Sequence, residues 1–293
     1  MSEKKQKTNI QDLTICKSTA RMLERTRRDG VETAFDRAAD MRACPIGEKS
    51  ACCKHCAMGP CRLNANDPYA KKGVCGASVD TIQSRNFARM VASGTAAHSS
   101  HGMNMLNLFK DVINGKAPDY SIRDVAKLKA VAEALGIETD NKSTIEIARE
   151  LCDVYSAVYL QTDGEIPYCS RVPEGTLESW RKAGIVPRGA MIEVMELIQR
   201  THAGMDQDYR NLTTQINKTA LVDGWGGSMM ATDISDILFG TPSATNADVD
   251  MGCLKEDHVN IIINGHEPYL LDSIQVSVNQ PELLDHARKA GAK

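Results

Sequence analysis

The sequence lacks three features that would place it in large functional classes. No segment has a run of about 18 apolar residues, the length that a bilayer-crossing helix needs, so we expect no membrane span. The start, MSEKKQKTNIQDLTICKS, has basic residues but no apolar stretch of a secretory signal behind them. The formal net charge is −3 and the Lys and Arg residues are scattered, so we expect no nucleic-acid partner. These absences together predict a cytoplasmic protein.

Cysteine is the residue type that the sequence uses unusually. The chain has 293 residues, of which 42% are hydrophobic and 25% charged, which is enough for one large or two ordinary globular domains. It contains ten cysteines, and in a cytosolic chain of this size cysteines more often bind metal or catalyse reactions than form disulfides. Six are concentrated in one stretch: Cys44, Cys52, Cys53, Cys56, Cys61 and Cys75. The other four, which are Cys16, Cys152, Cys169 and Cys253, are isolated, and we assign them structural roles.

Helical periodicity covers most of the chain up to about residue 235. Between residues 16 and 43 we expect one or two helices, with Ser18 or Thr19 as a cap. The next is a long helix whose apolar face is formed by Ile82, Val91, Met105, Leu108 and Val112. Gly94 and Gly102 are the candidate points of interruption. The predicted helical segments are residues 16–43, 80–113, 121–136, 143–161 and 173–205. Ser143 and Glu146 have the spacing of a capping box at the start of the fourth segment, and a Gly/Pro break divides the fifth.

The pattern changes after residue 240. A connection rich in Gly, Pro, Ser and Asn leads to the β-branched run Val259–Ile263, which is followed by Asn-Gly and a helical pattern. This order is typical of the first strand and turn of a Rossmann-like α/β domain. One strand cannot form a sheet that is buried on both faces, so we expect this domain to be incomplete here. The predicted domains are a cluster module at 1–80, a helical domain at 81–240 and the start of an α/β domain at 241–293.

Four of the clustered cysteines can form one metal site. Cys53-x2-Cys56-x4-Cys61 and the later Cys75 supply the four thiolates that a cubane iron–sulfur cluster requires. A four-thiolate zinc site also fits this spacing. Gly59-Pro60, Gly73 and Gly76 favour the cluster, because they allow the backbone to bend closely around an inorganic core, although Gly-Pro is also an ordinary turn sequence.

Cys44 and Cys52 stand directly upstream of this motif. Side chains of adjacent residues diverge in an extended backbone, so Cys52 and Cys53 are expected to serve different centres. Two thiolates cannot hold a cluster alone, but a two-fold dimer would bring two copies together and supply four ligands. A redox disulfide and two buried free thiols are the alternatives that the residues leave open.

The strings ACPIGEKSACCKHCAMGPCRLN, KKGVCGASVDTI, AAHSSH and INGHEP resemble those of nickel-containing carbon monoxide dehydrogenases, and the likeness covers essentially the whole chain. The resemblance implies a mainly α N-terminal domain with a cysteine-rich iron–sulfur module and a following Rossmann-like domain. It assigns Cys53, Cys56, Cys61 and Cys75 to a [4Fe–4S] relay cluster. Cys44 and Cys52 become half of the ligands of a cluster shared across a homodimer, either [4Fe–4S] or [2Fe–2S], and His266 becomes an iron ligand of the nickel–iron–sulfur active site.

Two histidines of the long helix are implied to move protons. His98 and His101 are three residues apart and share one helix face. In the resembled family this stretch forms a proton path, with the His98 position near the active site. The chain has Asn104 and Asn107 where family members often continue the histidines, so the outer part of this path departs from the family pattern. The residues themselves also fit two polar side chains on a solvated face.

The implied activity is CO + H2O ⇌ CO2 + 2 e− + 2 H+, with electrons leaving through the clusters to a ferredoxin-type acceptor. An acetyl-CoA synthase subunit is a further partner that the resemblance suggests. Family members run well beyond residue 293 and carry the other active-site ligands there, so we expect this chain alone to load relay clusters without oxidising CO. Two alternatives are a hybrid-cluster protein of the hydroxylamine reductase type and a non-catalytic iron–sulfur electron-transfer fragment.

Overall fold

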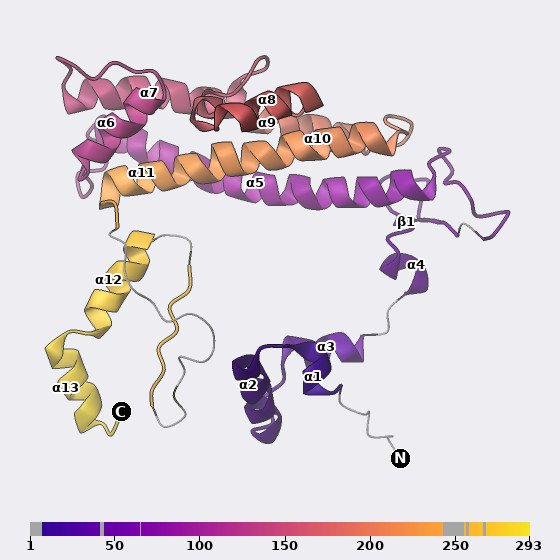
Figure 1. Cartoon of the computed structure of the whole chain (residues 1–293), viewed down its shortest axis with the longest axis horizontal. Helices are drawn as coiled ribbons and strands as arrows, with labels where there is room; N and C mark the ends of the chain where they lie inside the picture. Colours follow the sequence, from indigo (N-terminus) through magenta and orange to yellow (C-terminus); the bar gives the residue numbers. More distant parts are fainter. Residues whose placement is uncertain (1–7, 42–43, 65, 243–254, 256–257, 266–267) are drawn as a thin grey trace. The chain divides into compact units, whose positions relative to one another are not determined.

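The computed structural model describes residues 8–41, 44–64, 66–242, 255, 258–265 and 268–293. The chain divides into two compact units, one made of Met1–Cys44 with Ser243–Lys293 and the other of Pro45–Pro242. Figure 1 shows the elements of each, coloured along the sequence. No helix among the described residues combines the length and the apolar character needed to cross a membrane.

The Pro45–Pro242 unit is a helical bundle that begins with a short cysteine-rich hairpin. Its elements in chain order are α4 (Pro45–Glu48), β1 (Cys52–Cys53), β2 (Cys61–Arg62), α5 (Val79–Ile113), α6 (Val125–Ala134), α7 (Thr144–Leu160), the 3-10 helix η1 (Pro167–Arg171), α8 (Glu174–Ala183), α9 (Ala190–Arg200), α10 (Tyr209–Val222), the π-helix η2 (Asp223–Ser228) and α11 (Met229–Phe239). The helices predicted near residues 121–136, 143–161 and 173–205 are all present, and Ser143 and Glu146 form the expected capping box.

Helix α5 is the long central element of this bundle. It is helical throughout Val79–Ile113, so the interruption considered at Gly94 or Gly102 is not there. Helices α9, α10 and α11 and the π-helix η2 all pack against it (Figure 1). Much of its buried face is small or polar: Thr81, Arg85, Ala88, Ala92, Thr95, Ser99 and Gly102 precede the larger Leu106, Phe109 and Ile113. Small side chains allow the neighbouring helices to lie close to the α5 backbone.

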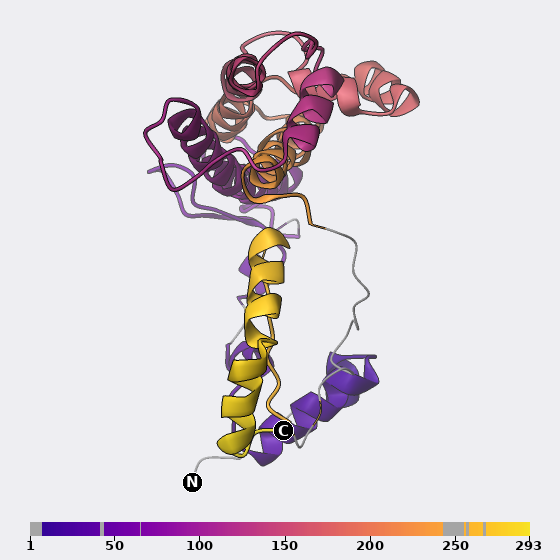
Figure 2. The ribbon, with the colours of Figure 1, turned by 90° about the vertical axis from the view of Figure 1, so that its left-hand side faces the viewer.

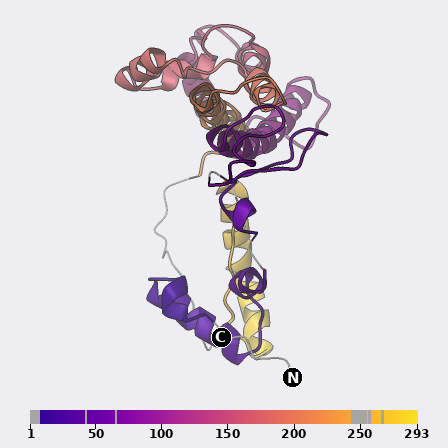
Figure 3. The ribbon, with the colours of Figure 1, turned by 90° about the vertical axis from the view of Figure 1, so that its right-hand side faces the viewer.

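Helices α10 and α11 are joined without a loop by the π-helix η2, whose sequence is DGWGGS. Figures 2 and 3, which view the bundle from its two ends, show α10 and α11 beside α5. The contact with α5 is backbone to backbone, because a Cβ added at Gly227 would lie 3.3 Å from the Ser99 amide nitrogen and 3.4 Å from the His98 carbonyl carbon. Short π-helical segments occur frequently at functional sites.

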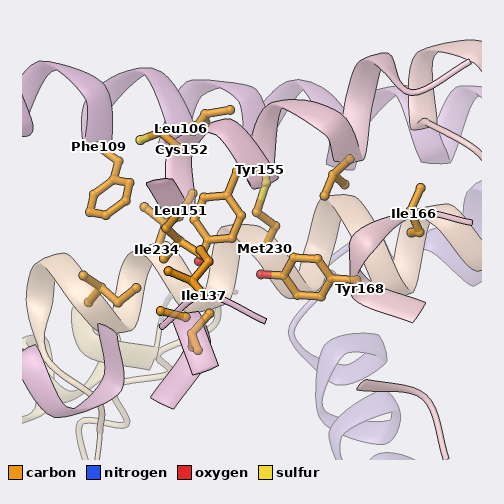
Figure 4. Close-up of a cluster of buried hydrophobic side chains, with 14 of the residues drawn as sticks. Leu106, Phe109, Ile137, Leu151, Cys152, Tyr155, Ile166, Tyr168, Met230 and Ile234 are labelled. Atoms are coloured by element: carbon orange, nitrogen blue, oxygen red, sulfur yellow. The ribbon is translucent and has the colours of Figure 1, made fainter. Parts of the chain in front are cut away.

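The main hydrophobic core lies where α5, α6, α7, η1 and α11 meet. Phe109, Tyr155, Tyr168 and Ile234 are fully buried there (Figure 4). The rings of Tyr155 and Tyr168 stack with centroids 6.2 Å apart. The Tyr168 hydroxyl donates a hydrogen bond of 2.8 Å to Asp233 Oδ2, so the polar end of this aromatic side chain is satisfied inside the core.

The other unit contains α1 (Ile10–Leu13), α2 (Lys17–Arg28), α3 (Ala34–Asp40), α12 (Pro268–Val278) and α13 (Pro281–Lys289). The prediction of one or two helices between residues 16 and 43 is confirmed by α2 and α3. The predicted cap of α2 was wrong, because Ser18 and Thr19 lie inside the helix and Cys16 is its N-cap. The Cys16 sulfur accepts a hydrogen bond from the Thr19 amide at 3.4 Å, a task usually done by a hydroxyl or carboxylate oxygen.

The strand predicted at Val259–Ile263 is not formed. These residues are described and carry no strand pairing, and Val259, Ile261 and Ile262 are 65%, 61% and 68% exposed. A strand needs a ladder of hydrogen bonds to a neighbouring segment, and in the described part of the chain the only main-chain bond that this run makes to another segment is from the Val259 amide to the Lys293 carbonyl oxygen, at 3.1 Å. One bond does not make a ladder, and the apolar side chains of the run stay exposed. The helix predicted after it is present as α12.

Candidate functional site

The cysteine-rich module is built on a two-stranded antiparallel hairpin in which Cys53 pairs with Cys61 and Cys52 with Arg62. The hairpin is attached to α5 by Asn86. The Asn86 amide donates to the carbonyl oxygens of Ser50 at 2.9 Å and Cys52 at 3.2 Å, and its oxygen accepts a hydrogen bond from His55 Nε2 at 2.8 Å. These bonds hold the loop between Cys53 and Cys61 in a fixed position over the start of α5.

All four cysteines predicted to hold the relay cluster line one cavity. Its lining residues are Cys53, His55, Cys56, Cys61, Gly73, Val74, Cys75, Ala77, Ile82, Arg85, Thr201 and Ala203. The structure therefore brings the three thiols of the hairpin segment together with the thiol of Cys75, which lies just before α5. The ligand role of these cysteines remains a prediction.

Hydrogen-bond donors point at two of these sulfurs. The Val74 amide donates to Cys61 Sγ at 3.5 Å, and Arg85 Nη1 lies 3.7 Å from Cys75 Sγ. Donors of this kind stabilise negative charge on cluster ligands and set the cluster potential. The chemistry of this donor set, four soft thiolates with amide and guanidinium donors around them, fits an iron–sulfur cluster.

The zinc alternative stands beside the cluster. Within the described residues, no three His, Cys, Asp or Glu side chains are grouped closely enough to hold a single metal ion. The four cysteines line the wall of one cavity, and four thiolates are a ligand set for either an iron–sulfur cluster or zinc.

Gly59 allows the hairpin loop to close tightly. A Cβ at this position would lie 3.0 Å from the Cys53 carbonyl oxygen and 3.4 Å from the Cys61 amide nitrogen. A larger residue here would force the neighbouring backbone to shift. The close approach at Gly59 is to the backbone of its own hairpin, and the bending of this segment around an inorganic core remains a prediction.

Burial and hydrogen bonding act oppositely on the thiols of the cavity. Burial raises the pKa of Cys53, against the opposing effects of the His55 amide and the positive charge of Arg85. Burial also acts to raise the pKa of Cys75, but hydrogen bonds from the Ala77 amide and from Arg85 outweigh it and lower that pKa. Arg85 thus stabilises the thiolate form of both, which is the form that binds metal.

The structure separates Cys52 from this cavity. Cys52 and Cys53 are successive residues of β1, whose side chains alternate, and Cys52 is not among the cavity-lining residues. Cys44 is exposed and belongs to the unit that contains the N-terminal helices, whereas Cys52 belongs to the helical bundle. The shared cluster predicted for this pair remains a prediction.

His98 is held by a partner that the sequence did not indicate. Its Nδ1 lies 2.7 Å from Asp223 Oδ1, and Asp223 opens the π-helix η2. Asp223 also accepts a hydrogen bond of 3.4 Å from the Ser228 hydroxyl at the other end of that π-helix. Sequence reasoning missed Asp223 because it is 125 residues from His98, and the only local signal was the glycine-rich DGWGG string. His98 and His101 both lie on the exposed face of α5, as do Asn104 and Asn107.

The remaining candidates have different outcomes. His266 and Cys253 lie outside the described residues. Cys152 and Cys169 are buried, and burial raises their pKa to about 12 and about 11, which makes both thiols inert at neutral pH. Cys16 caps α2. The structural roles expected for these three cysteines agree with their surroundings.

Comparison with known proteins gives one consistent result. The family model described as the Prismane/CO dehydrogenase family matches residues 51–293. Carbon monoxide dehydrogenase 1 of Methanosarcina mazei is 42% identical over 289 residues, which cover 98% of this chain and 46% of that protein. The carbon monoxide dehydrogenase/acetyl-CoA synthase subunit beta of Moorella thermoacetica is 39% identical over 286 residues, covering 96% and 42%.

A solved structure shows the same likeness. The as-isolated nickel-free carbon monoxide dehydrogenase of Thermococcus sp. AM4 superposes with a TM-score of 0.83 at 41% identity, covering 99% of this chain and 46% of that one. The chain thus spans a little under half the length of these relatives.

Proposed function

Because the chain belongs to the Prismane/CO dehydrogenase family, we propose that it forms the electron-relay part of an anaerobic carbon monoxide dehydrogenase. The whole enzyme would catalyse CO + H2O ⇌ CO2 + 2 e− + 2 H+. The observation that carries the proposal is the single cavity lined by Cys53, Cys56, Cys61 and Cys75. Four thiolates around one cavity are the ligand set of a [4Fe–4S] cluster.

The protein's part in electron relay is to hold and tune this site. The four thiolates would bind the irons, and the hairpin fixed to α5 by Asn86 keeps three of them in place. A bound cluster of this type accepts and passes on single electrons. The Val74 amide and the Arg85 guanidinium stabilise negative charge on Cys61 and Cys75.

His98 is proposed to transfer protons released by CO oxidation. Its Nδ1–H donates to Asp223, which fixes the ring orientation, and Nε2 is the atom proposed to take up and release the proton. His101 stands one helical turn further along the same exposed face and would receive the proton next. Asn104 and Asn107 cannot titrate, so beyond His101 the proton would have to pass to water.

The electron exit is proposed to continue through a cluster shared by two copies of the chain. Cys44 and Cys52 of each copy would supply its four ligands, for either a [4Fe–4S] or a [2Fe–2S] core. A ferredoxin-type protein would accept the electrons in the cytoplasm, and an acetyl-CoA synthase subunit is a further candidate partner. The alternation of Cys52 and Cys53 along β1 supports two separate centres.

The nickel–iron–sulfur centre is proposed to involve His266 as an iron ligand, with its other ligands on the part of the relatives that this chain does not span. The division into a cluster module at residues 1–80, a helical domain at 81–240 and the start of an α/β domain at 241–293 is likewise a proposal.

The relay proposal is tested by purifying the chain anaerobically and measuring iron, acid-labile sulfide and the electron paramagnetic resonance of the reduced protein. Cys56→Ser and Cys75→Ser should each lose about four irons per chain relative to wild type. Cys16→Ser is the matched control, since a serine there can still cap α2, and it should keep all of its iron. Zinc in place of iron, or full iron content in both ligand variants, would contradict the proposal.

A further inference from the structure

Arg85 is a buried cation in the wall of the cysteine-lined cavity. Its side chain is 1% exposed. Nη2 donates to the main-chain oxygen of Asp206 at 2.5 Å, and Nη1 lies 3.7 Å from Cys75 Sγ. Nε is buried and has no hydrogen-bond partner in the described part of the chain. The Nε–H group of the guanidinium is therefore a buried donor without an acceptor in the described part of the chain.

No carboxylate among the described residues is ion-paired with this charge. Arg85 contacts the main chain of Asp206, but the carboxylate of that residue pairs elsewhere, with Oδ2 at 2.8 Å from Arg200 Nη1. The Asp206 carbonyl oxygen that Arg85 does contact is neutral. Burying a cation without a counter-charge is strongly unfavourable, and a nearly complete burial is found in proteins only where an anion compensates it.

The cavity supplies that anion once it holds a cluster. A core bound by four thiolates carries a net negative charge, which grows by one on each reduction. We propose that Arg85 is the buried counter-charge of the relay cluster, with its guanidinium donors directed at cluster and ligand sulfur, and that it raises the reduction potential of that cluster. A cation at this position stabilises the more negative, reduced form, so removing the charge disfavours reduction. The inference depends on the proposed relay function of the four cysteines.

The competing role for Arg85 is that of a structural strut, which ties α5 to the Asp206 segment through one hydrogen bond. Two substitutions separate these roles. Arg85→Gln keeps a neutral donor and removes the charge, whereas Arg85→Lys keeps the charge and changes the shape. Arg149→Gln is the control, because Arg149 lies on the exposed face of α7 and is not among the cavity-lining residues.

The experiment is a redox titration of the anaerobically prepared chain, followed by electron paramagnetic resonance, together with iron analysis. A Cys52→Ser background removes any shared cluster from the titration. The midpoint potential should shift to more negative values in Arg85→Gln, shift clearly less in Arg85→Lys and stay near wild type in Arg149→Gln. Loss of iron from Arg85→Gln but not from Arg85→Lys would also support the counter-charge.

An unchanged midpoint potential in an iron-replete Arg85→Gln variant would overturn the inference. Iron loss in both Arg85 variants, or equal potential shifts in both, would show that the shape of the side chain matters and its charge does not. If the chain with its wild-type Arg85 binds no iron at the four cysteines, the relay function itself is wrong, and that result is recognisable before any Arg85 variant is compared.

Discussion

The proton path proposed for His98 depends on the contact between its ring and Asp223. Nδ1 lies 2.7 Å from Asp223 Oδ1, which selects the tautomer with the proton on Nδ1. Asp223 is the first residue of the π-helix η2. A carboxylate that orients a histidine in this way also stabilises the imidazolium that forms during proton transfer.

We predict that Asp223→Asn slows proton transfer. In the complete enzyme, kcat for CO oxidation should fall by about tenfold or more, with little change in KM, because the neutral amide no longer stabilises the imidazolium by its charge. Steady-state kinetics across a pH series would measure this. The matched control is Thr232→Ala on the exposed side of α11, which should leave kcat unchanged. Equal kcat in the Asp223→Asn variant and wild type would exclude a role for this pair.

Glu193 gives the bundle a stabilising interaction that depends on pH. Its carboxylate is 0% exposed and accepts hydrogen bonds from Arg188 Nε at 2.9 Å and from Gln215 Nε2 at 2.5 Å. Burial acts to raise the pKa of Glu193, but the bonds from Arg188 and Gln215 outweigh it and hold that pKa below its ordinary value of 4.5. A depressed carboxyl pKa contributes stability above the unfolded-state value, and that contribution is lost as the pH falls through the folded-state value.

Glu193→Gln should therefore lower the free energy of unfolding at pH 7 by about 2–4 kcal/mol, since Arg188 loses a buried partner. The difference between variant and wild type should stay constant down to the ordinary carboxyl pKa of 4.5 and shrink below it. Urea unfolding at a series of pH values would show this, and comparing the two proteins cancels any acid loss of clusters that both share. Glu178→Gln, at an exposed pair with Lys182, should change stability by less than about 0.5 kcal/mol. A pH-independent difference would mean that the carboxylate charge is not the cause.

At the level of whole elements, the close approach of α5, α7 and η2 depends on Gly102. A Cβ at Gly102 would overlap the Tyr159 hydroxyl and would lie 2.9 Å from the Gly227 carbonyl oxygen. One obstacle is a side chain and the other is backbone, so the contact can relax only in part. Gly94 serves as a control position in the same helix, because a Cβ there would meet nothing within 4 Å.

Gly102→Ala should destabilise the protein by about 1–3 kcal/mol through overpacking. Gly94→Ala should instead stabilise it by about 0.5–1 kcal/mol, because alanine loses less backbone freedom than glycine when a helix forms. Adding Tyr159→Phe to Gly102→Ala should recover part of the loss. Unfolding midpoints of the four proteins would test this, and a Gly102→Ala variant as stable as Gly94→Ala would show that the three elements do not approach as described.

The elements that the sequence predicted well are those defined by local signals. The capping box at Ser143 and Glu146 and the periodicity of α6, α7, α8 and α9 depend on neighbouring residues, and these helices are present. The buried face of α5 was harder to predict. Its predicted apolar positions include Val91 and Met105, which are only half-buried. Ala92 and Thr95 are fully buried instead, because small side chains let other helices approach.

At the candidate site, too, contacts between residues close in sequence could be predicted and contacts between distant residues could not. The spacing of Cys53, Cys56 and Cys61 is local, and these thiols with Cys75 do line one cavity. Arg85 and Asp223 could not be found from sequence, because their contacts with Asp206 and His98 join residues that are 121 and 125 positions apart. The strand predicted from the β-branched run at Val259–Ile263 is not formed, because a strand also requires a ladder of bonds to a neighbouring segment, which a local pattern does not supply.

At the scale of the whole molecule, the proposed relay cluster and the proposed active site differ in how many of their ligands lie in this chain. Four thiolates for the relay cluster line one cavity. For the nickel–iron–sulfur centre, His266 is the one residue in these 293 that the family resemblance assigns as a ligand. One imidazole cannot retain a metal–sulfur assembly of this kind, because such clusters are held by several thiolates.

We therefore predict that the 293-residue chain, purified anaerobically after growth with nickel, contains iron and sulfide but far less than one nickel per chain, and does not reduce a dye with CO. The exposed run of Val259, Ile261 and Ile262 gives an independent measurement, since these side chains need a neighbouring strand to be buried. A polypeptide corresponding to the rest of a relative should, when added, reduce hydrogen exchange at this run and raise nickel content at the same time. The relative added by itself is the control for its own nickel. Stoichiometric nickel with substantial CO-dependent dye reduction by the chain alone would show that it holds active-site ligands beyond His266, and that the ligand count is wrong.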